Sequence, residues 1–287
     1  MRHADIRALV AAAPTVLARG PVALIFAEHG IALDATLAHH LQLGFGAVVA
    51  FLPPGIPAPA LDDPRLHPVR YPVMARGAVA EAVNRVAAVL PGQWIYWGYD
   101  AEFLYFPFCE TRTVRDLLTF HAEERREAML AQVIDLYPAD LARAPEGVCR
   151  DHAMLDRTGY FALGRTGPDG QPLDRQLDFF GGLRWRFEEH IPADRRRIDR
   201  IALLRARPGV TLDDHGLTSD AEMNTYACSW HHNLTCAVAS FRVARGLRDN
   251  PDSRAAIHRF RWRNSVRFSW HSQQLMDLGL MEPGQWF

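Results

Sequence analysis

Apolar runs alternate with helix-like segments over the first hundred residues of the chain. Residues 22–27 and 47–52 are continuous apolar runs, which is typical of strands buried on both faces of a sheet. Between them, residues 34–43 carry apolar side chains at helical spacing and stop at Gly44, a common helix end. The pattern therefore predicts a strand, a crossover helix and a second strand.

The alternation of predicted strands and helices continues as far as the acidic residues near position 100. Further elements are predicted as helices at 4–19 and 77–90, a Pro-rich loop at 53–68, a short strand at 69–71, a strand at 94–99 and an extended stretch at 102–108. Alternating strands and helices predict a parallel sheet with crossover helices.

The second half of the chain reads as loop-rich. It is predicted to hold one or two helices at 113–136, irregular polar stretches at 150–192 and 212–233, a strand at 200–205, and helices at 237–248 and 253–263. We find no internal repeat and no long linker, so the pattern predicts an N-terminal α/β half that carries a loop-rich C-terminal half.

Composition narrows the class of protein. The 287 residues are 48% hydrophobic and 23% charged with a formal net charge of −1, which is typical of a globular protein and gives no general attraction to nucleic acid. All 32 basic residues are Arg, so a Schiff-base or P-loop lysine is excluded. The four cysteines lack CxxC spacing, which argues against a zinc ribbon. With no signal-like N-terminus and only short apolar runs, a cytoplasmic protein is expected.

Two carboxylates follow the strand predicted at 94–99. Asp100 and Glu102 stand two residues apart where that strand ends, and ligands of open α/β sheets bind at the carboxyl ends of strands. Such a pair can hold Mg²⁺ or Mn²⁺ against a diphosphate, because hard cations prefer oxygen ligands. In a regular strand, residues two apart point to the same face. The alternative is that Asp100 makes a turn and Glu102 is merely exposed.

Several segments resemble, in order, a bacterial glycosyltransferase family 2-like group with the GT-A fold. Residues 99–104, Tyr-Asp-Ala-Glu-Phe-Leu, resemble its Asp-x-Asp-Glu-Phe-Leu element. Residues 22–28 resemble its opening strand, and residues 37–45 its next helix with a Leu-Gly turn. Residues 180–184, Phe-Gly-Gly-Leu-Arg, are similar to a Phe-Gly-Gly-x-Arg motif, and His215 and the Trp-His-His at 230–232 follow in the family order.

The resemblance covers roughly residues 22–247 and implies a GT-A-like α/β fold with a mixed, mostly parallel sheet. It implies domain limits of 1–20 for an N-terminal helical extension, 21–250 for the transferase domain and 251–287 for a helical, aromatic extension. The implied function is transfer of a sugar from a nucleoside-diphosphate donor to a glycan or cell-envelope acceptor. A catalytically inactive relative that binds a glycan or a protein is the alternative.

The donor-site chemistry departs from the family pattern. Tyr99 and Ala101 stand where the family has its metal-binding aspartates, and prolines replace its polar nucleotide loop after the second strand. Glu28, Asp100, Glu102 and Arg184 remain the predicted donor-binding residues, with Asp100 and Glu102 as ligands of Mn²⁺ or Mg²⁺. Either these two form a shifted metal site, or the donor binds without metal, or the protein no longer transfers sugar.

The candidate catalytic bases near the acceptor hydroxyl are histidines. The resemblance implies His215 and His232 as the candidate catalytic bases, and an imidazole can supply a pKa near neutrality. Asp213, Asp214 and Asp220 compete for that role. The Gly-Gly-Leu-Arg-Trp-Arg segment at 181–186 fits a diphosphate or an acidic sugar, or equally a strand with exposed arginines.

The C-terminal region mixes arginines with aromatic residues between positions 254 and 270. We favour an amphipathic helix that is docked by its aromatic side chains, because the chain as a whole is not basic. A peripheral membrane contact through this region is the alternative, and no nucleic-acid partner is expected.

Overall fold

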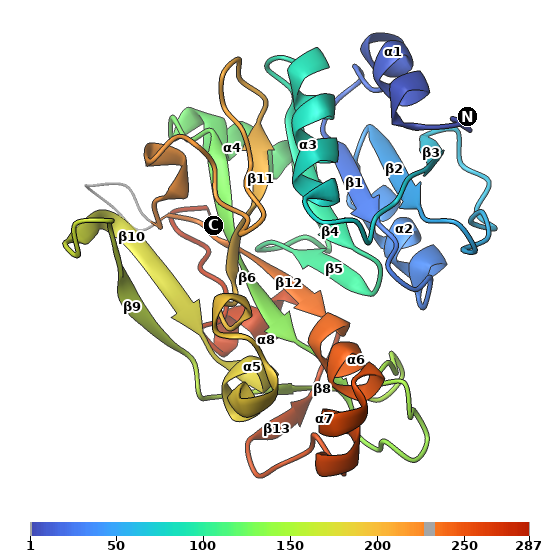
Figure 1. The fold of residues 1–287 in the computed structure, drawn as a ribbon. Coiled ribbons are helices and arrows are strands. Elements are labelled where there is room, and N and C mark those ends of the chain that lie inside the picture. Colours follow the sequence, from blue (N-terminus) through green and yellow to red (C-terminus); the bar gives the residue numbers. More distant parts are fainter. Residues whose placement is uncertain (1, 227–232, 287) are drawn as a thin grey trace. The chain divides into compact units, whose positions relative to one another are not determined.

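The computed structural model describes residues 2–226 and 233–286. Its main feature is an eight-stranded, mixed and mostly parallel sheet with the strand order β3-β2-β1-β4-β11-β6-β12-β5 (Figure 1). The strands are β1 Val22–Phe26, β2 Ala47–Leu52, β3 Leu66–Arg70, β4 Trp94–Tyr99, β5 Glu102–Tyr105, β6 Ala128–Asp135, β11 Asp199–Arg205 and β12 Cys236–Ser240. The α/β class predicted from the sequence is thereby confirmed.

Two compact units make up the chain. The first holds residues up to Phe103, Thr111–Leu130 and Ile201–Asn224. The second holds Leu104–Glu110, Ala131–Arg200 and the residues from Thr225 onward. The predicted domain limits at residues 20 and 250 stay a prediction.

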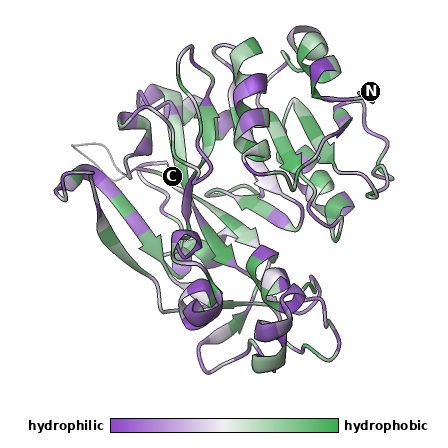
Figure 2. Ribbon diagram, viewed as in Figure 1, coloured by the Kyte–Doolittle hydropathy of each residue, from purple (hydrophilic) through white to green (hydrophobic). Residues whose placement is uncertain are grey.

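The first unit contains the parallel part that the N-terminal pattern predicts. β1 pairs in parallel with β2 on one side and with β4 on the other, and β2 pairs in parallel with β3. β11 runs antiparallel to β4. Figure 2 shows the hydrophobic colouring of β1 and β2, whose side chains are all buried. Burial on both faces explains why these strands read as unbroken apolar runs.

The α-helices in the described part of the first unit are α1 Ile6–Val16, α2 Leu33–Gln42, α3 Ala78–Val89 and α4 Val114–Glu123. Helix α1 begins where the Asp5 side chain accepts from the Ala8 N–H, and α1 packs beside α3 (Figure 1). Helix α4 begins with a capping box, in which Thr113 and Asp116 accept from each other's backbone N–H groups.

The second unit pairs β6 with β12 in parallel and adds two small antiparallel sheets. These are a β9-β10 ribbon and a β13-β8-β7 sheet. The further elements are β7 Tyr137–Pro138, β8 Ala153–Asp156, β9 Phe161–Thr166, β10 Pro172–Phe180, β13 Ser265–Arg267, α5 Gly182–Arg186, α6 Arg242–Asp249, α7 Pro251–Ala256 and α8 Ser272–Asp277. One core cluster packs Tyr137 and Leu183 against Phe260.

Four predictions for the second half are wrong. The helix predicted at 253–263, and the docked amphipathic helix expected between 254 and 270, do not form: α7 covers only Pro251–Ala256, and Ser265–Arg267 is the strand β13. Residues 113–136 are not helical throughout, because α4 ends at Glu123 and β6 follows as a fully buried strand. Cys236–Ser240 is a buried strand rather than the start of a helix. Residues 150–192 are not irregular, since they contain three strands and a short helix. Short apolar runs carry no periodicity that separates a buried strand from a helix.

No helix in the part of the chain that the structure describes is long and apolar enough to span a bilayer.

A buried histidine makes the first unit sensitive to acid. The His121 ring is fully enclosed, its Nε2 lies 2.8 Å from the Ala128 carbonyl oxygen, and burial lowers its pKa from 6.5 to about 4. The unfolded chain therefore takes up a proton at this histidine near pH 6.5 that the folded chain refuses until about pH 4. Stability should fall as the pH drops through that window.

We expect His121→Gln, which cannot titrate but can donate to the same carbonyl, to flatten this pH dependence by about 1–3 kcal/mol. Urea unfolding of both proteins at neutral pH and near pH 4.5 measures it. His67 has a pKa that burial also lowers to about 4, so some slope remains. Equal slopes for parent and variant would contradict the assignment.

Candidate functional site

The order of strands reverses between β1 and β4 in the first unit. From β1 the chain continues to β2 and β3 on one side, whereas β4 lies on the other side. Glu28 follows β1 and Asp100 follows β4, so both lie at the carboxyl ends of neighbouring parallel strands. Ligands of open α/β sheets bind at such a reversal. We call these two loops the switch-point site.

Asp100 joins the two loops of the switch-point site. Its carboxylate accepts from the backbone N–H groups of Glu28 at 2.8 Å, His29 at 3.2 Å and Gly30 at 2.7 Å. The side chain is only 6% exposed. A buried carboxylate with three N–H donors holds a loop firmly, because each donor would otherwise lose its partner.

The surroundings of Asp100 disfavour the charged form of its carboxyl group. Burial raises the pKa of its carboxyl, and the nearby Glu28 carboxylate raises it further. The three backbone N–H bonds act in the opposite direction without cancelling the effect of burial. Glu28 itself is only partly buried, so the switch-point site exposes one carboxylate and hides the other.

A turn separates Asp100 from Glu102. Ala101 lies in the left-handed region with φ 58°, and its N–H donates to Thr36 Oγ1 of α2 at 3.0 Å. Glu102 therefore begins a different strand, β5, and is 1% exposed. Its Oε2 accepts from the Tyr99 N–H at 2.9 Å. The two carboxylates do not follow one another along a regular strand, so the predicted same-face pair does not form.

These contacts compete with the predicted Mn²⁺ or Mg²⁺ ion, which stays a prediction. Asp100 Oδ2 already accepts two N–H groups and Oδ1 accepts a third, and Glu102 is turned to the backbone. A hard cation would have to share the Asp100 oxygens with these donors or replace them. Among residues 2–226 and 233–286, no three His, Cys, Asp or Glu side chains gather as a metal centre.

The loop after β2 closes over the glycine of the switch-point site. A side chain at Gly30 would meet Ile56 Cγ2 at 3.2 Å, so Ile56 lies against this backbone. Arg70, the last residue of β3, donates to the carbonyl oxygens of Pro53 at 3.2 Å and Ile56 at 2.6 Å. The Pro-rich loop is thus fixed by a guanidinium, and Arg70 brings positive charge to the carboxyl edge of the sheet.

Arg184 lies in the second unit, in the short helix α5. Its backbone N–H donates to Asp135 Oδ2 at 3.3 Å, and its Nε lies 3.4 Å from Asp135 Oδ1. Its Nη1 donates to the Arg197 carbonyl oxygen. Burial raises the pKa of Asp135 to about 6, although Arg184 opposes that rise. The other predicted donor-binding residues belong to the first unit.

Asp156 of the second unit accepts from three different side chains, and the sequence patterns singled out neither Asp156 nor Tyr137. Trp262 Nε1 donates to its Oδ1 at 2.6 Å, Arg186 Nη1 lies 3.2 Å from both oxygens, and Tyr137 donates through its hydroxyl. Arg186 also lies over the Trp262 ring at 4.7 Å. These partners are distant in sequence, so no short motif signals the cluster.

The paired glycines at 181 and 182 have a packing reason. A Cβ on Gly181, whose φ is 152°, would lie 2.3 Å from Tyr160 Cδ1. A Cβ on Gly182 would lie 2.9 Å from Asp135 Oδ2. The segment that resembles Phe-Gly-Gly-x-Arg therefore packs its backbone against Tyr160 and Asp135.

We expect Gly181→Ala to lower the free energy of unfolding by about 1–3 kcal/mol, because the Tyr160 ring must move and alanine is strained at a φ of 152°. Gly164→Ala in β9 is the matched control, since nothing lies within 4 Å of its added Cβ. Urea unfolding measures both. If the two substitutions cost the same, the close packing at Gly181 carries no energetic weight.

Only one of the two candidate bases, His215, lies in the part of the chain that the structure describes. His215 is exposed in a loop of the first unit, where Asp213 Oδ1 accepts its N–H at 2.9 Å and that of Leu217 at 2.8 Å. His232 lies outside the described residues, and the base role of both histidines stays a prediction.

A comparison with known protein families and with curated proteins finds no match to this chain.

Proposed function

We propose that this protein is a GT-A-like glycosyltransferase that binds a nucleoside-diphosphate sugar at the switch-point site without a metal ion shared by Asp100 and Glu102. The observation that carries the proposal is the loop at 28–30, which Asp100 holds at the strand reversal. The ordered resemblance of residues 22–247 to family 2-like transferases supports the same function. The proposed acceptor is a hydroxyl group of a glycan or of another cell-envelope molecule.

The residues at this edge supply the contacts that a nucleotide needs. The partly buried Glu28 carboxylate can accept from ribose hydroxyls, as acidic residues after a strand do in nucleotide-binding sheets. A diphosphate would meet Arg70 and the start of α2, which has no side-chain cap and carries Asp34 in its first turn. Asp100 has a positioning role here, because it fixes the loop that carries Glu28.

Calorimetric titration with UDP-, GDP-, ADP- and CMP-sugars, with Mn²⁺ or with EDTA, tests the proposal. We expect one of these donors to bind with similar affinity in both conditions and to bind at least about tenfold more weakly to Glu28→Gln, which loses a charge-assisted hydrogen bond. The absence of binding with all four classes would refute donor recognition. Binding that requires Mn²⁺ would restore the metal site.

A second function, a catalytically inactive glycan-binding module, is favoured by an exposed aromatic pocket in the second unit. This pocket of about 180 Å³ is lined by Phe161, Phe180 and Trp185 with Arg184, Arg196 and Glu188. Phe161 and Phe180 stack at 5.3 Å, and Trp185 is 45% exposed. Aromatic walls with a few polar groups are typical of small-molecule sites.

Glycan-array binding by the parent and by Trp185→Ala tests this second function. A glycan signal that Trp185→Ala removes, in a protein that binds no nucleotide sugar, would favour the binding module over the transferase. A signal that is equal in both proteins would leave the aromatic pocket without that role.

A further inference from the structure

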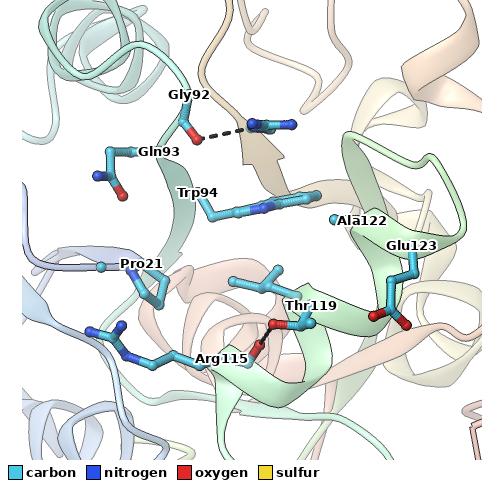
Figure 3. Close-up of a pocket in the computed structure, with 11 residues that line it drawn as sticks. Pro21, Gly92, Gln93, Trp94, Arg115, Thr119, Ala122 and Glu123 are labelled. Atoms are coloured by element: carbon cyan, nitrogen blue, oxygen red, sulfur yellow. Dashed lines mark hydrogen bonds between the residues drawn. The ribbon is translucent and has the colours of Figure 1, made fainter.

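A larger pocket lies at the other edge of the sheet in the first unit. It has a volume of about 530 Å³ and is shown in Figure 3. Gly20 and Pro21 lead into β1, and Gly92 and Gln93 lead into β4. The pocket therefore lies at the amino ends of the two strands whose carboxyl ends form the switch-point site. The two sites are distinct.

One face of α4 forms a wall of the pocket. The lining residues Arg115, Leu118, Thr119, Ala122 and Glu123 recur at intervals of three and four, so they share one side of the helix. This face mixes a cation, an anion, a hydroxyl and apolar groups. It is neither a purely apolar docking stripe nor a plain solvated surface.

Trp94 offers an aromatic surface opposite α4. Figure 3 shows its indole between Gly92 and Gln93 on one side and Arg115 and Thr119 on the other. The side chain is only partly buried, and its ring lies 5.9 Å from the ring of His121 on α4, at an interplanar angle of 65°. Partly exposed Trp faces are stacking surfaces for planar rings.

Positive charge stands directly beside this ring. Arg205 of β11 is the cross-strand partner of Trp94, so their side chains leave neighbouring backbone positions. Arg205 Nε donates to the Gly92 carbonyl oxygen at 3.2 Å and its Nη1 lies 3.9 Å from Glu127 Oε1, so the guanidinium is held on two sides. Arg115 is fixed in the same way by the Arg19 carbonyl oxygen. A guanidinium has five N–H groups, so each arginine can also donate to an anion.

Hydrogen-bond acceptors complete the lining. Gln93 donates through Nε2 to the Ala18 carbonyl oxygen at 3.0 Å, which leaves its Oε1 as an acceptor. Glu123 is exposed and lies at the C-terminal end of the α4 face. The pocket thus combines a stacking ring, two held cations and two acceptors within a volume suited to a small ligand.

We propose that this pocket binds a planar aromatic ring that carries an anionic group, with the size of a nucleoside monophosphate. The ring stacks on Trp94, the anion accepts from Arg205 and Arg115, and an exocyclic amino group donates to Glu123 or Gln93. This site does not depend on the transferase activity, because it shares no residue with the switch-point site.

The test uses AMP, UMP and 4-aminobenzoate as probes in calorimetric titrations of the full chain. We expect saturable binding of at least one probe, and binding weaker by about tenfold or more in Trp94→Leu and in Arg205→Gln, since stacking and charge pairing are both lost. Trp94→Phe keeps a ring and should restore most of the affinity. Adenosine and ribose 5-phosphate, each with half of the recognised chemistry, should bind more weakly than AMP.

Two control variants distinguish binding at this pocket from a general effect of positive charge and from binding at the switch-point site. Arg85→Gln removes an exposed arginine that pairs with Glu81 at 2.6 Å on α3, and it should bind the probes as the parent does. Glu28→Gln should bind 4-aminobenzoate as the parent does, because this probe lacks the ribose that Glu28 is proposed to bind at the switch-point site. Melting curves confirm that each variant is folded, and Arg205→Gln remains the test if Trp94→Leu unfolds.

The proposal is overturned if no probe binds the parent, or if both pocket variants bind as the parent does.

Discussion

Asp156→Ala is expected to destabilise the protein by about 3–5 kcal/mol, because it leaves the buried positive charge of Arg186 without its carboxylate partner. Arg186, with 11% of its side chain exposed, would lose its carboxylate. Trp262 Nε1 and the Tyr137 hydroxyl would lose the acceptor that they share. Urea unfolding at neutral pH measures the loss.

Asp174→Ala is the matched control for this prediction. Asp174 also pairs with an arginine, at 2.9 Å from Arg175, but 86% of its side chain is exposed. Its loss should cost less than about 1 kcal/mol, as for other surface ion pairs. If Asp156→Ala were as mild as the control, the buried network would not hold the second unit together.

Asp100→Ala is expected to cost about 2–4 kcal/mol, because three backbone N–H groups lose a charged acceptor. Asp100→Asn should restore little, since its amide would present N–H donors to at least one of the N–H groups of Glu28, His29 and Gly30. We also expect donor binding to weaken in both variants, because the loop that carries Glu28 is released. Urea unfolding and donor titration are the two measurements.

Glu28→Gln separates an effect on donor affinity from an effect on the stability of the fold. Glu28 is partly exposed, so its neutral substitute should unfold within about 0.5 kcal/mol of the parent while donor affinity falls. A stable Asp100→Ala that binds donor as the parent does would show that the loop does not need its carboxylate.

The sequence predicted the N-terminal sheet well for a physical reason. β1, β2 and most of β4 are buried and bounded by turn residues, so their apolar runs are unambiguous. β6 is equally buried, but it contains Gln132 and Asp135 and follows α4 and charged residues, so its short apolar runs have no period that marks it as a strand.

The candidate site was predictable in position but not in detail. That Asp100 and Glu28 meet at one edge follows from parallel strand order. That Asp100 turns inward depends on the left-handed Ala101 and on Thr36 of α2, which no pattern reveals because alanine rarely adopts that conformation. Asp156 and its partners come together only through tertiary packing.

A crystal structure of the protein soaked with UDP and Mn²⁺ decides whether the switch-point site holds a nucleotide without a metal ion on Asp100 and Glu102. We predict density for the nucleotide at this site, with its ribose beside Glu28 and its diphosphate near Arg70 and the start of α2. Asp100 should remain bonded to the N–H groups of Glu28, His29 and Gly30. A Mn²⁺ ion coordinated by both Asp100 and Glu102, or a nucleotide bound only elsewhere, would overturn the proposed donor site.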